Sequence, residues 1–302
     1  MSFQRHLYEL KTMKNLYGTG VALVTPFTAD LEVDFKSLKN LLRHTSKGAD
    51  YYVVMGTTGE SPTVSGEEKR VILEFIKKNN VKGLPIMYGI GGNSTHHCID
   101  EIRSTDLKGV DALLSVSPYY NKPSQEGIFQ HFRAIAKASP IPVMLYNIPG
   151  RTGSNVSADT TLRLISASKK IIGTKEASGN IEQCMNIVSK APADFALVSG
   201  DDMLTVPLYG VGSKGVISVL ANAYPQIFKK IKDYVAAGNF NKAKDEQFKL
   251  LSINGMMYEE GNPVGIKQVL ANLGICEPHV RLPHTPASEG LQRRIAAAMK
   301  GI

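Results

Sequence analysis

Cysteine is scarce in this chain: Cys98, Cys184 and Cys276 are the only three, and they lie far apart in the sequence. No Cys-x-x-Cys pair or cysteine–histidine ligand spacing occurs, so the sequence predicts neither a disulfide framework nor a zinc site. The chain also lacks an apolar run approaching roughly 18 residues, and its polar N-terminus lacks the apolar core of a secretion signal. We therefore expect a protein of the reducing cytoplasm.

Long blocks of one charge are absent as well, although the formal net charge is +8. A positive sum attracts any anion, from nucleic acid to a small carboxylate. The Lys and Arg residues are scattered, and no helix-turn-helix, zinc-finger or aromatic-basic pattern occurs. We therefore expect no nucleic-acid partner, and small carboxylate substrates remain compatible with the charge.

Short apolar, β-rich runs alternate with amphipathic helical patterns, as is typical of a parallel sheet covered by helices. The predicted strands are Thr19–Thr25, Tyr51–Met55, Pro85–Gly89, Ala112–Val116, Val143–Tyr146, Ile171–Lys175, Phe195–Ser199 and Gly215–Val219. The predicted helices are Phe35–Lys47, Glu67–Lys78, Thr95–Leu107, Gln125–Ala138, Ala158–Ser168, Ile181–Lys190 and Tyr224–Ala237. Eight βα units indicate a (β/α)8 TIM barrel. An open doubly wound sheet is the alternative, but no Gly-x-Gly-x-x-Gly motif follows the first strand.

We expect three segments along the chain: an N-terminal extension (1–15), the barrel (16–238) and a C-terminal helical extension (239–302). Helical spacing without strand-like runs predicts the helices of the last segment, Asn241–Met257, Pro263–Leu273 and Ala287–Met299. In barrels of this kind the catalytic groups gather at the C-terminal ends of the strands. Those ends carry mainly hydroxyl groups and one lysine: Thr57–Thr58, Tyr119–Tyr120, Tyr146, Lys175, Gly200–Asp201 and Ile217.

Lys175 closes the run Ile171–Thr174, so we expect its amine to lie in a largely apolar barrel interior. Desolvation there favours the neutral amine, and a neutral amine can condense with a ketone to form an imine. The alternative is a lysine that reaches solvent from the strand end or pairs with Glu176. The position of Lys175 in the sequence does not by itself decide between the two interpretations.

Hydroxyl groups near Lys175 suit the proton movements of imine formation. Tyr146 ends the preceding strand, and a relay through Thr57 and Tyr120 is a candidate path for protons to solvent. Each tyrosine also fits a core or rim position with one satisfied hydroxyl. Tyr146 therefore supports the proton-relay hypothesis only in combination with Thr57 and Tyr120.

Two further features suit carboxylate binding. Gly56–Gly59 is a small-residue turn that presents backbone N–H groups and the hydroxyls of Thr57 and Thr58, although such turns are common in barrels without a ligand. Arg151 follows Tyr146 closely and can hold a carboxylate bidentately, or it forms a surface salt bridge. The adjacent His96 and His97 do not have metal-ligand spacing, and Asp201–Asp202 fits a helix cap.

In combination these motifs resemble the family of the N-acetylneuraminate lyases and dihydrodipicolinate synthases, over the whole chain after the N-terminal extension. The matching segments are Gly56–Ser61, Ser117–Gly127, Tyr146–Gly153, Gly173–Ala177, Ser199–Asp202, Gly215–Val219 and Arg281–Pro286. The resemblance implies a lyase that condenses pyruvate with L-aspartate 4-semialdehyde through a Lys175 Schiff base. This reaction is the first committed step of diaminopimelate and lysine biosynthesis, and it needs no metal or other cofactor.

The resemblance also implies roles for single residues. Tyr146, Thr57 and Tyr120 match the proton relay, and Thr58 matches the residue that binds the carboxylate of pyruvate. Arg151 matches the residue that binds the carboxylate of the semialdehyde and argues against the sugar-acid lyases, which typically lack arginine there. The remaining carried-over residues line the site through their backbones: Gly200 and Ile217.

By the same resemblance, Tyr120 enters the active site of a neighbouring subunit in a homotetramer built as a dimer of dimers. The chain departs from lysine-regulated members at Gly66, Lys69 and His97, while Asn93 and Tyr119 are retained. Fewer acceptors and an added cation disfavour binding of a cationic amino acid. The sequence therefore predicts weak or absent feedback inhibition by lysine.

Two other functions stay open at this point. The first is a related pyruvate aldolase acting on a sugar acid, of the N-acetylneuraminate lyase type. The second is a barrel without catalysis that binds a keto acid or a protein partner. A pure binder has no use for the relay of Lys175, Tyr146, Thr57 and Tyr120, so we favour the enzyme.

Overall fold

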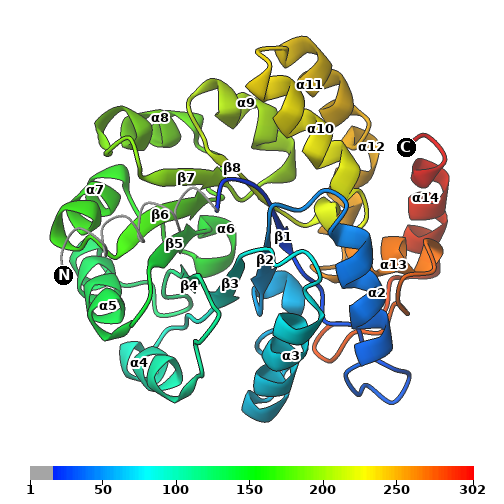
Figure 1. Cartoon of the computed structure of the whole chain (residues 1–302), viewed down its shortest axis with the longest axis horizontal. Helices are drawn as coiled ribbons and strands as arrows, with labels where there is room; N and C mark the ends of the chain where they lie inside the picture. Colours follow the sequence, from blue (N-terminus) through cyan, green and yellow to red (C-terminus); the bar gives the residue numbers. More distant parts are fainter. Residues whose placement is uncertain (1–15) are drawn as a thin grey trace. The chain divides into compact units, whose positions relative to one another are not determined.

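The computed structural model describes residues 16–302, and its eight strands form a closed barrel in chain order (Figure 1). The strands are β1 (Gly18–Ala22), β2 (Tyr51–Val54), β3 (Ile86–Gly89), β4 (Ala112–Val116), β5 (Val143–Asn147), β6 (Ile171–Glu176), β7 (Ala196–Ser199) and β8 (Gly215–Ser218). The paired strands run parallel. The predicted TIM barrel is confirmed, and each predicted strand matches an observed one to within three residues at either end.

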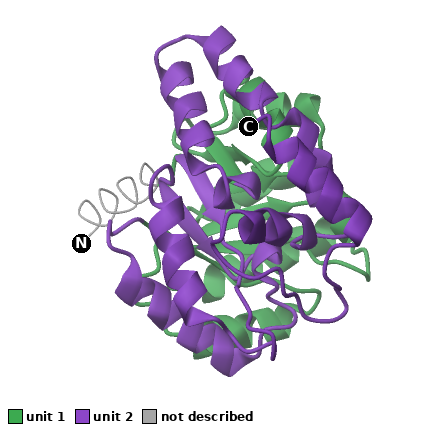
Figure 2. Cartoon of the chain, turned by 90° about the vertical axis from the view of Figure 1, so that its right-hand side faces the viewer, with its two compact units in different colours: residues 1–17, 85–217 green, residues 18–84, 218–302 purple. Residues whose placement is uncertain are grey.

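The chain divides into two compact units, which Figure 2 colours green and purple. Among the described residues, unit 1 comprises residues 16–17 and 85–217, and unit 2 comprises residues 18–84 and 218–302. Unit 1 therefore carries β3 to β7 and β8 up to Ile217, and unit 2 carries β1, β2, the last residue of β8 and the C-terminal helices. The predicted barrel boundary at residue 238 stays a prediction, and the predicted extension over residues 1–15 lies outside the described residues.

Helices follow the strands in both units. Unit 1 contains α4 (Thr95–Ser104), α5 (Gln125–Ala138), α6 (Pro149–Thr152), α7 (Ala158–Ala167), α8 (Ile181–Lys190) and α9 (Thr205–Gly210). Unit 2 contains α2 (Phe35–Thr45), α3 (Gly66–Asn79), α10 (Pro225–Ala236), α11 (Phe240–Phe248), α12 (Leu251–Asn254), α13 (Val264–Asn272) and α14 (Glu289–Met299). No helix within residues 16–302 is long and apolar enough to cross a membrane.

Local sequence explains where these elements begin and why they pack. Short polar side chains accept an N–H from the first turn of most helices, and Ser65 with Glu68 forms a full capping box before α3. The strands are almost completely buried on both faces, as expected for a parallel sheet enclosed by helices. That continuous burial is why the strands read as unbroken apolar runs.

The predicted helix Asn241–Met257 is wrong as a single element. The structure breaks it into α11, α12 and the 3-10 helix η4 (Gly255–Met257). At the break the N–H of Leu250 binds the carbonyl of Gln247, and the N–H of Ile253 binds that of Leu250. These three-residue spacings tighten the chain and interrupt the regular four-residue ladder.

Stability should depend on pH through His131 in α5. Its ring is 4% exposed, its Nδ1 lies 2.8 Å from Thr95 Oγ1, and burial lowers its pKa to about 4. The unfolded chain therefore takes up the proton first as the pH falls. The free energy of unfolding should decrease between about pH 6.5 and pH 4, by roughly 3 kcal/mol in all.

The measurement is urea denaturation of the wild type and His131→Gln at pH 7, 5.5 and 4.5. The glutamine side chain of the variant does not titrate, so the stability difference between the two proteins should narrow as the pH falls. A constant difference across this range would contradict the assignment.

Candidate functional site

The centre of the candidate site in unit 1 is a pair of inward-facing residues on adjacent strands. Tyr146 on β5 is the register partner of Lys175 on β6. The Lys175 Nζ lies 4.2 Å from the centroid of the Tyr146 ring, and each residue is 6% exposed. The structure thus brings these two predicted residues together and excludes a lysine that reaches into solvent.

A glycine creates the space for the Lys175 side chain. A Cβ added at Gly200 would lie 3.0 Å from the Lys175 Cε and 3.1 Å from its Cγ. The Gly200 N–H donates to the carbonyl of Glu176 at 2.8 Å, which holds the two strand ends together. Gly200 therefore has a steric reason to be a glycine, and Ile217 lies buried within β8.

Glu176 does not serve as a counter-ion that ties down Lys175, as the alternative interpretation required. Its carboxylate accepts N–H groups from Asn147, Gln183 and the Ser178 backbone, at 2.9 to 3.1 Å. Successive strand residues face opposite sides, so Glu176 points away from the lysine side chain. The amine of Lys175 stays available for a substrate.

Tyr120 occupies a very different environment. Its side chain is 87% exposed, and its φ of 72° lies in the left-handed region, as does the φ of 44° at Lys122. Such backbone conformations are uncommon outside glycine and concentrate at functional sites. The Tyr120 phenol therefore points away from its own chain into solvent.

Arg151 lies on the exposed surface of α6, a single helical turn that the sequence patterns did not predict. Pro149 occupies the first turn, and Gly153 ends the helix with a φ of 72°. The signals of a proline start and a glycine stop were present in the sequence, but four residues are too few to show helical periodicity.

In unit 2 the Gly56–Gly59 turn contains the 3-10 helix η1 (Thr57–Gly59). Thr58 is 3% exposed, and its Oγ1 accepts an N–H from Asn262 Nδ2 at 3.1 Å. Because this contact uses a lone pair of the hydroxyl, the Thr58 proton remains free to be donated to an anion.

A buried ion pair, which the sequence reasoning missed, anchors the end of this turn. Lys267 Nζ lies 2.5 Å from Glu60 Oε1 and donates to the His279 carbonyl at 2.7 Å, and the Arg281 N–H donates to Glu60 Oε2 at 3.0 Å. Burial lowers the pKa of Lys267, and the Glu60 charge opposes that shift. The one available signal was a lysine within the largely apolar stretch Val264–Leu270 of α13.

The other predicted polar residues have structural contacts. Asp201 caps η2 (Asp202–Leu204) by accepting the Met203 N–H at 2.9 Å, which confirms the helix-cap interpretation. His96 pairs with Asp100 on the same helix at 3.2 Å. No cluster of His, Cys, Asp and Glu able to hold a metal occurs within residues 16–302.

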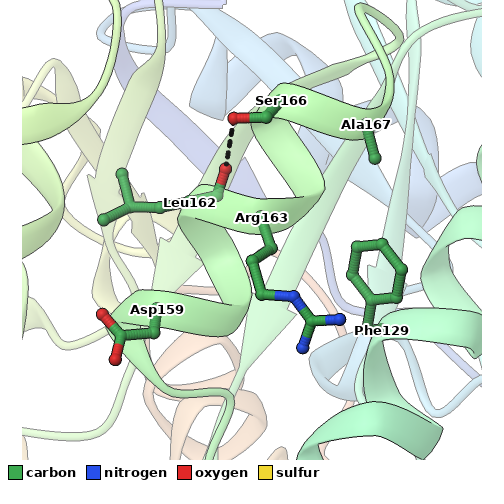
Figure 3. A pocket seen from close by; sticks show the side chains of 6 residues that line it. All are labelled: Phe129, Asp159, Leu162, Arg163, Ser166 and Ala167. Atoms are coloured by element: carbon green, nitrogen blue, oxygen red, sulfur yellow. Dashed lines mark hydrogen bonds between the residues drawn. The ribbon is translucent and has the colours of Figure 1, made fainter.

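A shallow groove lies on the helical layer between α5 and α7, and it contains none of the predicted site residues (Figure 3). Arg163 stacks over the Phe129 ring at 4.3 Å and pairs with Glu126 at 2.7 Å. Its charge and its planar face are both engaged within the chain, so this groove is a weaker candidate than the strand ends.

Comparisons with known proteins agree on one family. The sequence model of the dihydrodipicolinate synthetase family matches residues 15–302. A 4-hydroxy-tetrahydrodipicolinate synthase of Cytophaga hutchinsonii is 50% identical, over 95% of this chain and 96% of its own length. A dihydrodipicolinate synthase variant described as monomeric superposes with a TM-score of 0.92 at 34% identity, covering 96% of this chain and 97% of that one. The dihydrodipicolinate synthase of Thermotoga maritima superposes with a TM-score of 0.91 at 35% identity, covering 94% of this chain and 97% of that one.

The buried pair makes a testable contribution to stability. Lys267→Met leaves the Glu60 carboxylate buried without its cation and should lower the free energy of unfolding by about 3–5 kcal/mol. Adding Glu60→Gln removes the stranded charge, so the double variant should be more stable than the single one. Chemical denaturation measures both.

The exposed Lys39→Met in the same unit is the control and should stay within about 0.5 kcal/mol of wild type. If the double variant is no more stable than Lys267→Met alone, the unpaired Glu60 charge is not the cause of the destabilisation, and the prediction is wrong.

Proposed function

The chain belongs to the dihydrodipicolinate synthetase family, and we propose that it condenses pyruvate with L-aspartate 4-semialdehyde through an imine on Lys175. The observation that carries the proposal is the buried Lys175 amine beside the Tyr146 ring. A lysine amine buried at this position and not paired with Glu176 is available to form an imine with a ketone.

The reaction follows from that amine. Lys175 Nζ adds to the carbonyl carbon of pyruvate, and loss of water leaves the imine. Loss of a methyl proton gives the enamine, whose carbon attacks the aldehyde of the second substrate. The amine of that substrate then displaces Lys175 from the imine carbon, which closes the ring and returns the free enzyme.

The proton transfers of these steps need hydroxyl groups, and we assign them to Tyr146, Thr57 and Tyr120. Thr58 would bind the pyruvate carboxylate, which suits its free hydroxyl proton and its contact with Asn262. Gly200 and Ile217 would line the site. No metal or other cofactor enters any step.

Arg151 decides between the two lyase hypotheses. A planar guanidinium binds a carboxylate through two parallel hydrogen bonds, and we assign it to the carboxylate of the semialdehyde. Sugar-acid aldolases of the N-acetylneuraminate lyase type typically lack an arginine at this position, so Arg151 argues against that alternative.

We further propose that the enzyme works in the cytoplasm as a homotetramer in which Tyr120 completes the site of a neighbouring subunit. The outward position and left-handed backbone of Tyr120 support this assignment. All three cysteines are free and buried, as suits a reducing compartment.

Borohydride trapping tests the proposed nucleophile. Reduction of the imine should leave a pyruvate-derived mass on the wild-type protein, and peptide mapping should place it on Lys175. Lys175→Ala should gain no mass, and exposed Lys39→Met should label like wild type. A folded wild-type protein that gains no adduct would eliminate both lyase hypotheses and leave only a binding barrel.

Inhibition by lysine tests the regulatory prediction. Because Gly66 and Lys69 replace polar acceptors and His97 replaces a carboxylate, we expect no inhibition at sub-millimolar lysine. The assay is the initial rate of condensation against lysine concentration, with both substrates near their KM values. Half-inhibition below one millimolar would show that other contacts bind the effector.

A further inference from the structure

The strand ends that carry Tyr146 and Lys175 also carry a second pair of register partners on their outer face. Asn147 follows Tyr146, Glu176 follows Lys175, and the two residues face each other across β5 and β6. Asn147 is 1% exposed and Glu176 is 2% exposed. Both side chains are polar, so their burial requires an explanation in hydrogen bonds.

Asn147 uses its amide to close the segment that contains Arg151. Its Oδ1 accepts the Val156 N–H at 2.9 Å, and its Nδ2 donates to Asn155 Oδ1 at 2.7 Å. The same Nδ2 reaches both Glu176 oxygens, at 3.0 and 3.1 Å. Arg151 lies midway along the loop that these bonds close.

Gln183 on α8 also binds the C-terminal end of that loop, at Asn155 and Val156. Its Nε2 donates to the Val156 carbonyl at 3.2 Å and to Glu176 Oε2 at 3.1 Å. Its Oε1 accepts the Asn155 amide at 2.8 Å. The position of the loop therefore depends on one buried carboxylate and the side chains that donate to it.

The donors around Glu176 are all neutral N–H groups, and they converge on both of its oxygens. Such an arrangement has a fixed polarity, because only an acceptor at residue 176 and a donor at residue 147 satisfy it. Replacing one partner leaves a buried donor or acceptor without a hydrogen bond. This unsatisfied group should destabilise the closed position of the loop.

We propose that Asn147 and Glu176 are positioning residues for Arg151, and that they set the affinity for the carboxylate of the second substrate. This inference rests on the proposed function of Arg151. Lys175 and Tyr146 point to the opposite face of the same strands, so imine formation with pyruvate should proceed without the closed loop. The two half-reactions can therefore be separated by mutation.

Asn147→Asp is the sharpest test, because it keeps the Oδ1 acceptor and changes only the donor. The new oxygen faces Glu176 at about the same 3.0 Å. Two ionised carboxylates at that distance repel each other, and a proton taken up at lower pH would be shared between them and would restore a donor. The KM for the semialdehyde should rise roughly 10- to 100-fold at about pH 8, the loss expected when a binding group moves by about 1 Å. It should recover toward wild type as the pH falls and the shared proton is restored.

The rate of borohydride-trapped pyruvate adduct formation should stay within about twofold of wild type, because the amine and its surroundings are unchanged. Asn180→Asp is the matched control, since it makes the same substitution at the exposed N-cap of α8, where either side chain accepts the Gln183 N–H. It should leave both measurements unaltered.

Asn155→Ala provides a second test in case Asn147→Asp does not fold. Asn155 is only partly buried, and the hydrogen bonds from Asn147 and Gln183 to Val156 remain in this variant. We expect a smaller rise in the same KM, again with normal adduct formation. A rise in neither Asn147→Asp nor Asn155→Ala would overturn the inference. Loss of the adduct in Asn147→Asp would also overturn it, because the pair would then support the lysine.

A double-mutant cycle with Arg151→Ala separates this inference from the proposed function. If the pair acts through Arg151, adding Asn147→Asp to Arg151→Ala should cause no further rise in KM. If Arg151→Ala alone leaves the KM for the semialdehyde unchanged, the proposed role of Arg151 fails. If Arg151→Ala raises it and Asn147→Asp raises it independently and additively, only the positioning inference fails.

Discussion

The register between β5 and β6 is the constraint on which the site in unit 1 depends. In a parallel pair the side chains alternate between the two faces, so one register fixes both faces at once. Here it sets Tyr146 opposite Lys175 on the inner face and Asn147 opposite Glu176 on the outer face. A slip of one residue on one strand would separate both pairs. The Tyr146–Lys175 pair and the Asn147–Glu176 pair therefore occupy adjacent positions of the same ladder.

Buried charges in this chain are satisfied in two different ways. In unit 2, Lys267 and Glu60 neutralise each other, since an isolated ion would be too costly to bury. In unit 1, Glu176 is surrounded by neutral N–H donors, which satisfy the carboxylate without a cation. The difference matters for the proposed mechanism, because an ion pair between Glu176 and Lys175 would occupy the amine that we propose attacks the ketone.

The sequence predicted the features that repeat or that carry unusual chemistry. The eight strands were visible as apolar runs, and Lys175 was conspicuous because it ended the run predicted for β6 (Ile171–Lys175), which the structure extends by one residue to Glu176. The sequence did not reveal the contacts between distant positions. Lys267 and Glu60 are 207 residues apart, and no local pattern joins them. Helix α6 was missed because four residues show no period, and η4 with α12 was predicted as a continuous helix because the apolar spacing there is regular.

The position of Arg151 shows why recognising motifs does not explain a site. A single helical turn such as α6 is unstable by itself, because nucleating a helix fixes several residues for one hydrogen bond. Pro149 and Gly153 define where this turn begins and ends, but they do not attach it to the strands. Asn147 makes that attachment through the Val156 N–H and the Asn155 side chain. The position of the exposed Arg151 guanidinium thus depends on an amide buried behind it, one residue beyond Tyr146.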